Sequence, residues 1–84
     1  LCVMPAWTFV ATPLAAIHAG LEPFFVDVDI ASQSVNPKKL ALEINIISQY
    51  KKIGAVIVVA PFGRPLNTED WDQFTRNTGI PVLI

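Results

Sequence analysis

Residues 5–12 read PAWTFVAT and residues 23–29 read PFFVDVD, and the arrangement of these two stretches decides the fold. A segment with an amphipathic, helical pattern separates them. The first stretch places an aromatic side chain, Phe9, beside the hydroxyls of Thr8 and Thr12, just past a short apolar strand. Open α/β sheets bind ligands at that position, outside the carboxyl ends of their strands. The two stretches therefore predict a strand–helix–strand unit with a binding site at its carboxyl edge.

The rest of the chain continues the alternation of strand and helix. Strands are expected at residues 1–4, 23–28, 55–60 and 81–84, and helices at residues 12–19, 37–51 and 68–78. Residues 55–60, AVIVVA, form an unbroken apolar run, which is typical of a central parallel strand covered on both faces. Gly20 and Gly79 are expected to end the first and third helices. The expected architecture is an α/β fold in the order β-α-β-α-β-α-β, with right-handed crossovers and a mainly parallel sheet.

Capping residues mark the helix starts. The Asn36-Pro37 pair places a capping side chain before a proline at the first helical position, and Thr12-Pro13 does the same for the first helix. Thr8 remains a competing cap for that first helix. Thr68 is expected to cap the third helix, with acidic residues in its first turn.

The second helix is expected to bury one apolar face. Leu40, Ile44 and Ile47 recur at helical spacing, and Leu42 and Ile46 are expected to widen the same face.

Composition indicates that the chain is a piece of a larger domain. The 84 residues are 52% hydrophobic and only 15% charged, whereas soluble domains carry roughly 25% charged residues. Apolar faces in such excess are expected to be covered by further segments or by a partner. We therefore expect residues 1–84 to be part of a domain whose N- and C-terminal portions lie outside this sequence.

Charge and hydropathy argue against two classes of partner. The net charge is −1, and six lysines and arginines are spread along the chain, so there is no basic stripe for nucleic acid. The longest nearly uncharged apolar run, residues 53–62, is far shorter than the roughly 20 residues that span a bilayer. With no signal peptide at its start, the protein is expected to be cytoplasmic, with neither a nucleic-acid nor a membrane partner.

Few side chains are candidates for chemistry. Cys2 is the only cysteine, and its place in an apolar strand favours a buried, inert thiol. His18 lies late in a helix, where it suits a surface or capping role. Asp27 and Asp29 share one face of a strand. They either bind a divalent cation, as in a flavodoxin-like receiver, or end the strand and cap nearby backbone groups.

The motifs PAWTFVAT, FVDVD, AVIVVAPFGRP and GIPVLI, in this order and at this spacing, resemble the central part of the large domain of DegT/DnrJ-type sugar aminotransferases. These enzymes use pyridoxal 5'-phosphate (PLP) and have fold type I. The resemblance spans the whole chain and implies a fragment of a three-layer α/β/α domain. One departure is Ala60, which stands where the family often has a histidine.

The resemblance also implies cofactor contacts. Phe9 matches the aromatic position that stacks on the pyridine ring, and Thr8 lies beside it as a second cofactor-binding residue. From the residues alone, core or hydrophobic-staple packing at a helix start is the favoured role of Phe9, and a simple helix cap is the favoured role of Thr8. No catalytic residue and no metal ligand is expected within the chain.

The resemblance implies an activity for the full-length protein. The enzyme is expected to move an amino group, from glutamate, onto a nucleotide-linked keto-sugar, and to act as a homodimer. The phosphate-binding turn, the aspartate at the pyridinium nitrogen and the Schiff-base lysine are expected outside these 84 residues, so the isolated chain is expected to be inactive. A non-catalytic regulatory or sensory domain of the same fold is the alternative.

Overall fold

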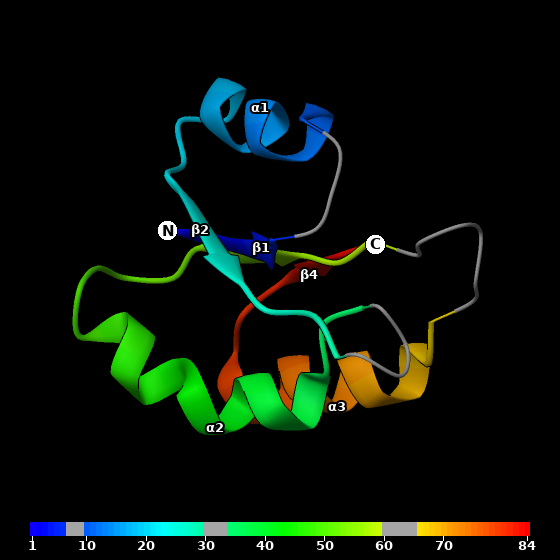
Figure 1. Cartoon of the computed structure of the whole chain (residues 1–84). Coiled ribbons are helices and arrows are strands. Elements are labelled where there is room, and N and C mark those ends of the chain that lie inside the picture. Colours follow the sequence, from blue (N-terminus) through cyan, green and yellow to red (C-terminus); the bar gives the residue numbers. More distant parts are fainter. Residues whose placement is uncertain (7–9, 30–33, 60–65) are drawn as a thin grey trace.

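The computed structural model describes residues 1–6, 10–29, 34–59 and 66–84. Its elements alternate along the chain as β1 (Cys2–Pro5), α1 (Ala11–His18), β2 (Pro23–Val26), α2 (Pro37–Ser48), β3 (Ala55–Ile57), α3 (Thr68–Thr78) and β4 (Val82–Leu83). This order, which can be followed by colour in Figure 1, is the one that the sequence predicts.

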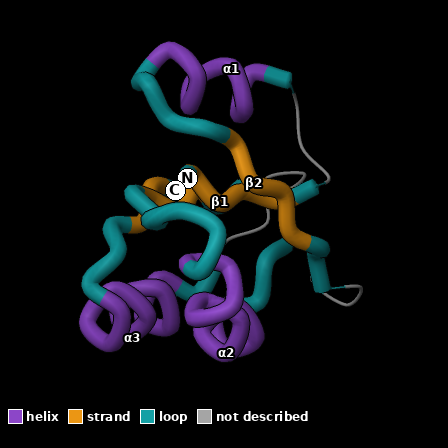
Figure 2. The backbone as a smooth tube through the Cα atoms, turned by 90° about the vertical axis from the view of Figure 1, so that its left-hand side faces the viewer, coloured by secondary structure: helices purple, strands orange, loops and turns teal. Residues whose placement is uncertain are grey.

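The strands form one parallel sheet in the order β2-β1-β3-β4. The central place predicted for residues 55–60 is confirmed, because β3 lies between β1 and β4. Figure 2 shows three layers, with α1 on one face of the sheet and with α2 and α3 side by side on the other. The α/β/α arrangement around a parallel sheet is therefore confirmed.

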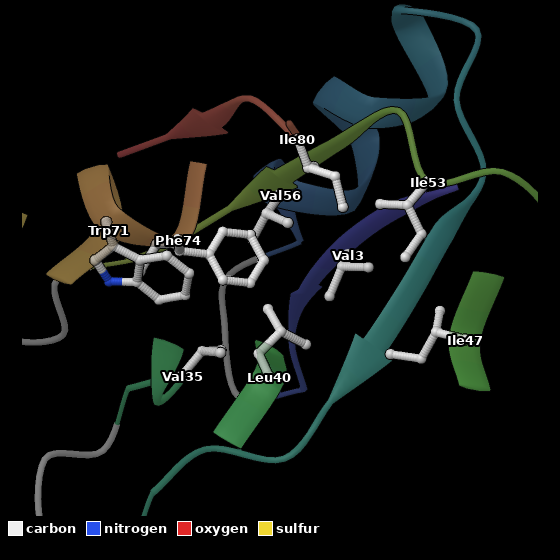
Figure 3. Packing of buried hydrophobic residues seen from close by; sticks show 10 residues of the cluster. Val3, Val35, Leu40, Ile47, Ile53, Val56, Trp71, Phe74 and Ile80 are labelled. Carbon is white, nitrogen blue, oxygen red and sulfur yellow. The ribbon is translucent and has the colours of Figure 1, made fainter. Parts of the chain in front are cut away.

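The main core lies between the sheet and the layer formed by α2 and α3 (Figure 3). Its members are Val3, Val35, Leu40, Ile47, Ile53, Val56, Val58, Trp71, Phe74 and Ile80. The rings of Trp71 and Phe74 meet edge to face, with centroids 5.3 Å apart and planes at 66°. Aromatic quadrupoles favour this geometry. Two large side chains therefore hold α3 against the sheet.

A smaller cluster lies on the other face, where Cys2 and Met4 of β1 pack against Ala16 of α1. Successive strand residues point to opposite faces, which is why Val3 belongs to the main core and its neighbours do not. On the α1 side, Ala55 and Ile57 of β3 are only half-buried. The prediction that the central strand is covered on both faces is thus confirmed for the face toward α2 and α3. The face toward α1 is covered only in part.

The strands are shorter than predicted. β2 ends at Val26 rather than at residue 28, β3 ends at Ile57 rather than at residue 60, and β4 is confined to Val82–Leu83. β1 is the exception at its C-terminal end, because it includes Pro5, one residue past the predicted end at residue 4. The ladder tolerates this proline because the next amide, that of Ala6, donates to the Val26 carbonyl at 2.7 Å.

Two of the three predicted helix caps are wrong. Asn36 caps α2 as predicted, its Oδ1 accepting hydrogen bonds from the amides of Lys38 (3.0 Å) and Lys39 (3.3 Å). In α3 the cap is Asn67, whose Oδ1 accepts from the Asp70 amide at 3.3 Å. Thr68 is therefore the first helical residue and not the cap.

The start of α1 also differs from the prediction. The helix begins at Ala11, and Val10 occupies the cap position without a side-chain hydrogen bond. Thr12, predicted as the cap, is the second helical residue, and Pro13 is the third. A proline fits there because the first amides of a helix have no intrahelical acceptor. Thr8, the competing cap, lies outside the described residues.

The helix ends follow the glycines. Gly79 is the left-handed C-cap of α3, with φ of 72°. Gly20, with φ of 81°, follows the C-cap of α1, and the next amide, that of Leu21, donates to the Ala16 carbonyl at 2.9 Å. α2 ends at Ser48 rather than at residue 51.

The apolar face predicted for α2 is partly wrong. Leu40 and Ile47 are buried, but Leu42 and Ile46 are exposed. Leu42 lies two residues after Leu40, which places it roughly 200° away around the helix axis. Leu42 and Ile46 therefore belong to a second face of α2 that points outward.

Candidate functional site

The carboxyl edge of the sheet opens between β1 and β3. The register between these strands pairs Cys2 with Ala55 and Val3 with Val56, and it ends there. Beyond that point β1 stays paired with β2 through Pro5 and Val26, while the Val58 amide donates to the Leu83 carbonyl at 2.8 Å. The helices that follow these two strands, α1 and α3, lie on opposite faces of the sheet (Figure 2). Open α/β sheets bind ligands at such a place.

The segment that carries the predicted cofactor residues begins at this opening. It runs from Ala6, at the carboxyl end of β1, to Val10, at the start of α1. Thr8 and Phe9 themselves lie outside the described residues, as do Trp7 and the segment 60–65 that follows β3. The cofactor contacts of Phe9 and Thr8 therefore stay predictions.

Asp27 and Asp29 follow β2 rather than closing it, and both side chains are exposed. The amide of Asp29 donates to the Ser34 carbonyl at 2.8 Å. This backbone hydrogen bond joins Asp29 to Ser34 within the connection between β2 and α2. Among the described residues, no group of three or more histidine, cysteine, aspartate or glutamate side chains could hold a metal ion.

The other titratable candidates lie away from the opening. Cys2 is buried at the amino end of β1, and burial raises the pKa of its thiol. His18 is exposed in the last turn of α1. The Lys51 ammonium lies 2.9 Å from a carboxylate oxygen of Glu22, and this hydrogen bond, together with the positive charge, lowers the pKa of Glu22. Neither the thiol nor the imidazole is placed for catalysis at the opening.

A groove of about 370 Å³ lies between β2 and α2, on the far side of β2 from the opening. Its lining comprises Phe24, Phe25, Val26, Asp27, Asp29, Val35, Asn36, Lys39, Leu40, Glu43, Ile46 and Ile47. The sequence analysis did not predict this groove. One sign of it is in the sequence. Ile46 is apolar but does not lie on the side of the helix that Leu40 and Ile47, seven residues apart, share.

The model of the DegT/DnrJ/EryC1/StrS aminotransferase family matches residues 1–84, the whole of the sequence. The chain belongs to this family. The resemblance expected from the motifs is therefore confirmed.

Relatives of this DegT/DnrJ chain agree with the assignment. Protein MosB of Rhizobium meliloti is 32% identical over 81 residues, which cover 96% of the chain and 15% of MosB. A Bacillus cereus protein whose name places it among the PLP-dependent aminotransferases is 36% identical, with a TM-score of 0.82 over 96% of this chain and 21% of its own. DesI, solved with its TDP-sugar product, is 28% identical, with a TM-score of 0.78 over 96% of this chain and 19% of its own.

The chain therefore spans 15% of its curated relative and about a fifth of the solved structures that it matches. TM-scores of 0.82 and 0.78 over 96% of the chain confirm the predicted fold, that of part of a fold type I PLP-dependent enzyme. Within the part of the chain that the structure describes, no helix is long and apolar enough to cross a membrane.

Proposed function

We propose that this chain is the central part of the large domain of a longer, PLP-dependent aminotransferase. The enzyme transfers an amino group from glutamate to a nucleotide-linked keto-sugar. Membership of the DegT/DnrJ family supports the reaction type. Similarity to DesI, whose structure was solved with a TDP-sugar product, supports a nucleotide-linked sugar as the substrate class.

The separation of β1 from β3 beyond Val3 and Val56 is the observation that carries this proposal. It opens the sheet at the position where α/β folds bind cofactors, and the segment between Ala6 and Val10 starts at that opening. A flat heterocycle fits this opening if one aromatic side chain from the segment between Ala6 and Val10 stacks on the heterocycle. The described framework is therefore compatible with PLP.

Within this chain, Phe9 and Thr8 are the residues proposed to hold the cofactor. When bound, PLP supplies the electron-withdrawing ring that lets the amino group leave the donor and join the acceptor in two half-reactions. Phe9 orients that ring by stacking on it, which contributes about 0.5–1.5 kcal/mol beyond burial. Thr8 lines the same opening with its hydroxyl.

The lysine that binds PLP covalently is proposed to come from another part of the longer protein. The four lysines of the described residues lie on or just after α2, and Lys51 is paired with Glu22. None of these four is at the opening between β1 and β3. The isolated chain is accordingly proposed to be inactive, and the full-length enzyme to be a cytoplasmic homodimer with sites at the subunit boundary.

The test is an absorbance spectrum of the full-length protein before and after borohydride, combined with an amino-transfer assay. We expect a PLP band that borohydride fixes covalently, and transfer from glutamate to a TDP-linked keto-sugar. A free keto-acid acceptor is the control for substrate class, and transfer to it alone would contradict the sugar assignment. A protein without PLP and without transfer would support the regulatory or sensory alternative.

A further inference from the structure

The two faces of the sheet are covered unequally. A packed helix is about 10 Å across and neighbouring strands lie about 4.8 Å apart, so one helix covers roughly two strands. On one face, α2 and α3 together bury side chains from all the strands of the sheet. On the other face, the described residues provide only α1, which packs on β1 and β2 (Figure 2). The part of that face formed by β3 and β4 therefore has no helix over it.

The side chains on this uncovered part are apolar. Ala55 and Ile57 of β3 lie on the α1 face, and both are only half-buried. Leu83 of β4 pairs with Ile57, so its side chain points to the same face, where it is 65% exposed. These three residues are named here the bare face. Adjacent apolar side chains exposed in this way mark a surface that another segment covers.

The two free edges of the sheet differ in charge. The groove at the edge of β2 carries the charged side chains of Asp27, Lys39 and Glu43, and a further strand there would cover them at a cost. β4 consists of Val82 and Leu83 and carries no charge. Charged groups are typical of a strand that ends a sheet. The sheet is therefore expected to continue beyond β4 rather than beyond β2.

The handedness of the connections restricts which segment can cover the bare face. Crossovers between parallel strands are right-handed in about 98% of cases. The step from β1 to β2 carries its helix on the α1 face. The steps from β2 to β3 and from β3 to β4 run the opposite way across the sheet, and they carry their helices on the opposite face. A crossover helix on the α1 face must therefore belong to a step that runs toward β2.

We propose that the bare face is covered by a helix from the segment that directly precedes Leu1 in the longer protein. This inference rests on the proposed function, in which the chain is the central part of a larger domain. A step from a strand beyond β4 into β1 runs toward β2, so its helix lies on the α1 face, beside α1. That helix ends near Leu1, at the amino end of β1, and turns an apolar side toward Ala55, Ile57 and Leu83.

The segment after Ile84 is the main competitor for this position. It leaves from the carboxyl end of β4, and a step from there to a strand beyond β4 runs in the same direction as the step from β3 to β4. The same handedness then places its helix in the layer of α2 and α3. The segment before Leu1 is the one that suits the bare face.

Photo-cross-linking of the full-length protein tests this assignment. Benzoylphenylalanine in place of Leu83 reacts with the groups that touch it, and mass spectrometry of the digested protein identifies their peptide. We expect a cross-link to the roughly 30 residues before Leu1, since a crossover unit has about that length. Asp72, exposed on α3 in the opposite layer, is the matched control position. The same cross-linked peptide from position 72 would overturn the proposal.

The other occupants of the bare face give different products. A cross-link from position 83 to residues after Ile84 would assign the cover to the competing segment. In a mixture of isotopically light and heavy protein, a cross-link between the two would show that a second copy covers the surface. Each of these results, and the lack of any cross-link, would overturn the proposal.

Thiol reactivity provides a second measurement. In the full-length protein, Leu83→Cys should react with maleimide more slowly than Asp72→Cys by a factor on the order of ten, because a covered thiol reacts only when its cover opens. Equal rates would show that the face is bare in the whole protein and would contradict the inference.

The cover and the cofactor assignment can fail separately. The expected cross-link in a protein without a PLP band would contradict the proposed function alone. A normal PLP band in a protein that cross-links elsewhere would contradict only the assignment of the segment before Leu1.

Discussion

Val3 and Val56 are the last residues that pair β1 with β3, and beyond them each strand continues only with its outer neighbour. Both valines are buried beneath α2 and α3, so the point of separation is anchored in the main core. The point at which the two strands separate is therefore held by the packed sheet. Ala6 follows β1 at this point, and residues 7–9, which come next in the sequence, are the segment proposed to bind the cofactor.

The caps of α3 can be separated by mutation. Asn67→Ala should lower the free energy of unfolding by about 1 kcal/mol, because its side chain accepts the Asp70 amide. Thr68→Ala should change stability by less than half of that, since Thr68 is the first residue inside the helix. Urea unfolding of the two variants measures the difference. A larger loss for Thr68→Ala than for Asn67→Ala would mean that Thr68, and not Asn67, caps the helix.

The pair formed by Glu22 and Lys51 predicts a pH dependence of stability. The lowered pKa of Glu22 means that the folded state holds the proton less tightly than the unfolded state does. The pair therefore stabilises the fold above the usual glutamate pKa of about 4.3, and this contribution is lost as pH falls through the lower folded value. Because both groups are exposed, the effect on stability is small.

An NMR titration of the Glu22 carboxyl group measures this shift directly. In Lys51→Gln the pKa of Glu22 should return toward its ordinary value. Lys38→Gln is the matched control and should leave it in place. If the pKa of Glu22 is the same in Lys51→Gln and in the wild type, Lys51 is not the cause of its lowered value.

The Cys2 thiol should be unreactive in the folded protein. It is only 1% exposed, and burial raises its pKa, so both access and the thiolate fraction are low. Alkylation by iodoacetamide at neutral pH should be slower than in urea by a factor on the order of 100, as read by mass spectrometry of the Cys2 peptide. Equal rates in both conditions would mean that β1 is not held in the core.

The strand and helix order was predictable because each element carries a local signal. The apolar run at residues 55–60 indicated a central strand, and Asn36-Pro37 marked the start of α2 through a cap that the structure shows. Trp71 and Phe74 stand three positions apart, a spacing that places both on one side of α3, and both are buried. Each of these features is set by residues close to one another in the sequence, so it can be predicted from the sequence pattern.

Other features depend on neighbours in space and were missed. Whether Leu42 and Ile46 face inward is decided by where the sheet contacts α2, and Leu40 and Ile47 already fill that contact. The cap of α3 required the extended backbone of Asn67, which the sequence does not show. The groove beside β2 arises from the edge position of that strand, which follows only from the full sheet order.

The central claim concerns Phe9 at the opening between β1 and β3, and the dissociation constant of PLP from the full-length protein tests it most directly. Phe9→Ala should weaken binding about tenfold and lower turnover, because the stacked ring is lost. Phe9→Tyr, which keeps a ring, and Leu14→Ala, on the exposed side of α1, should bind like the wild type. Wild-type PLP affinity and turnover in Phe9→Ala would contradict the account.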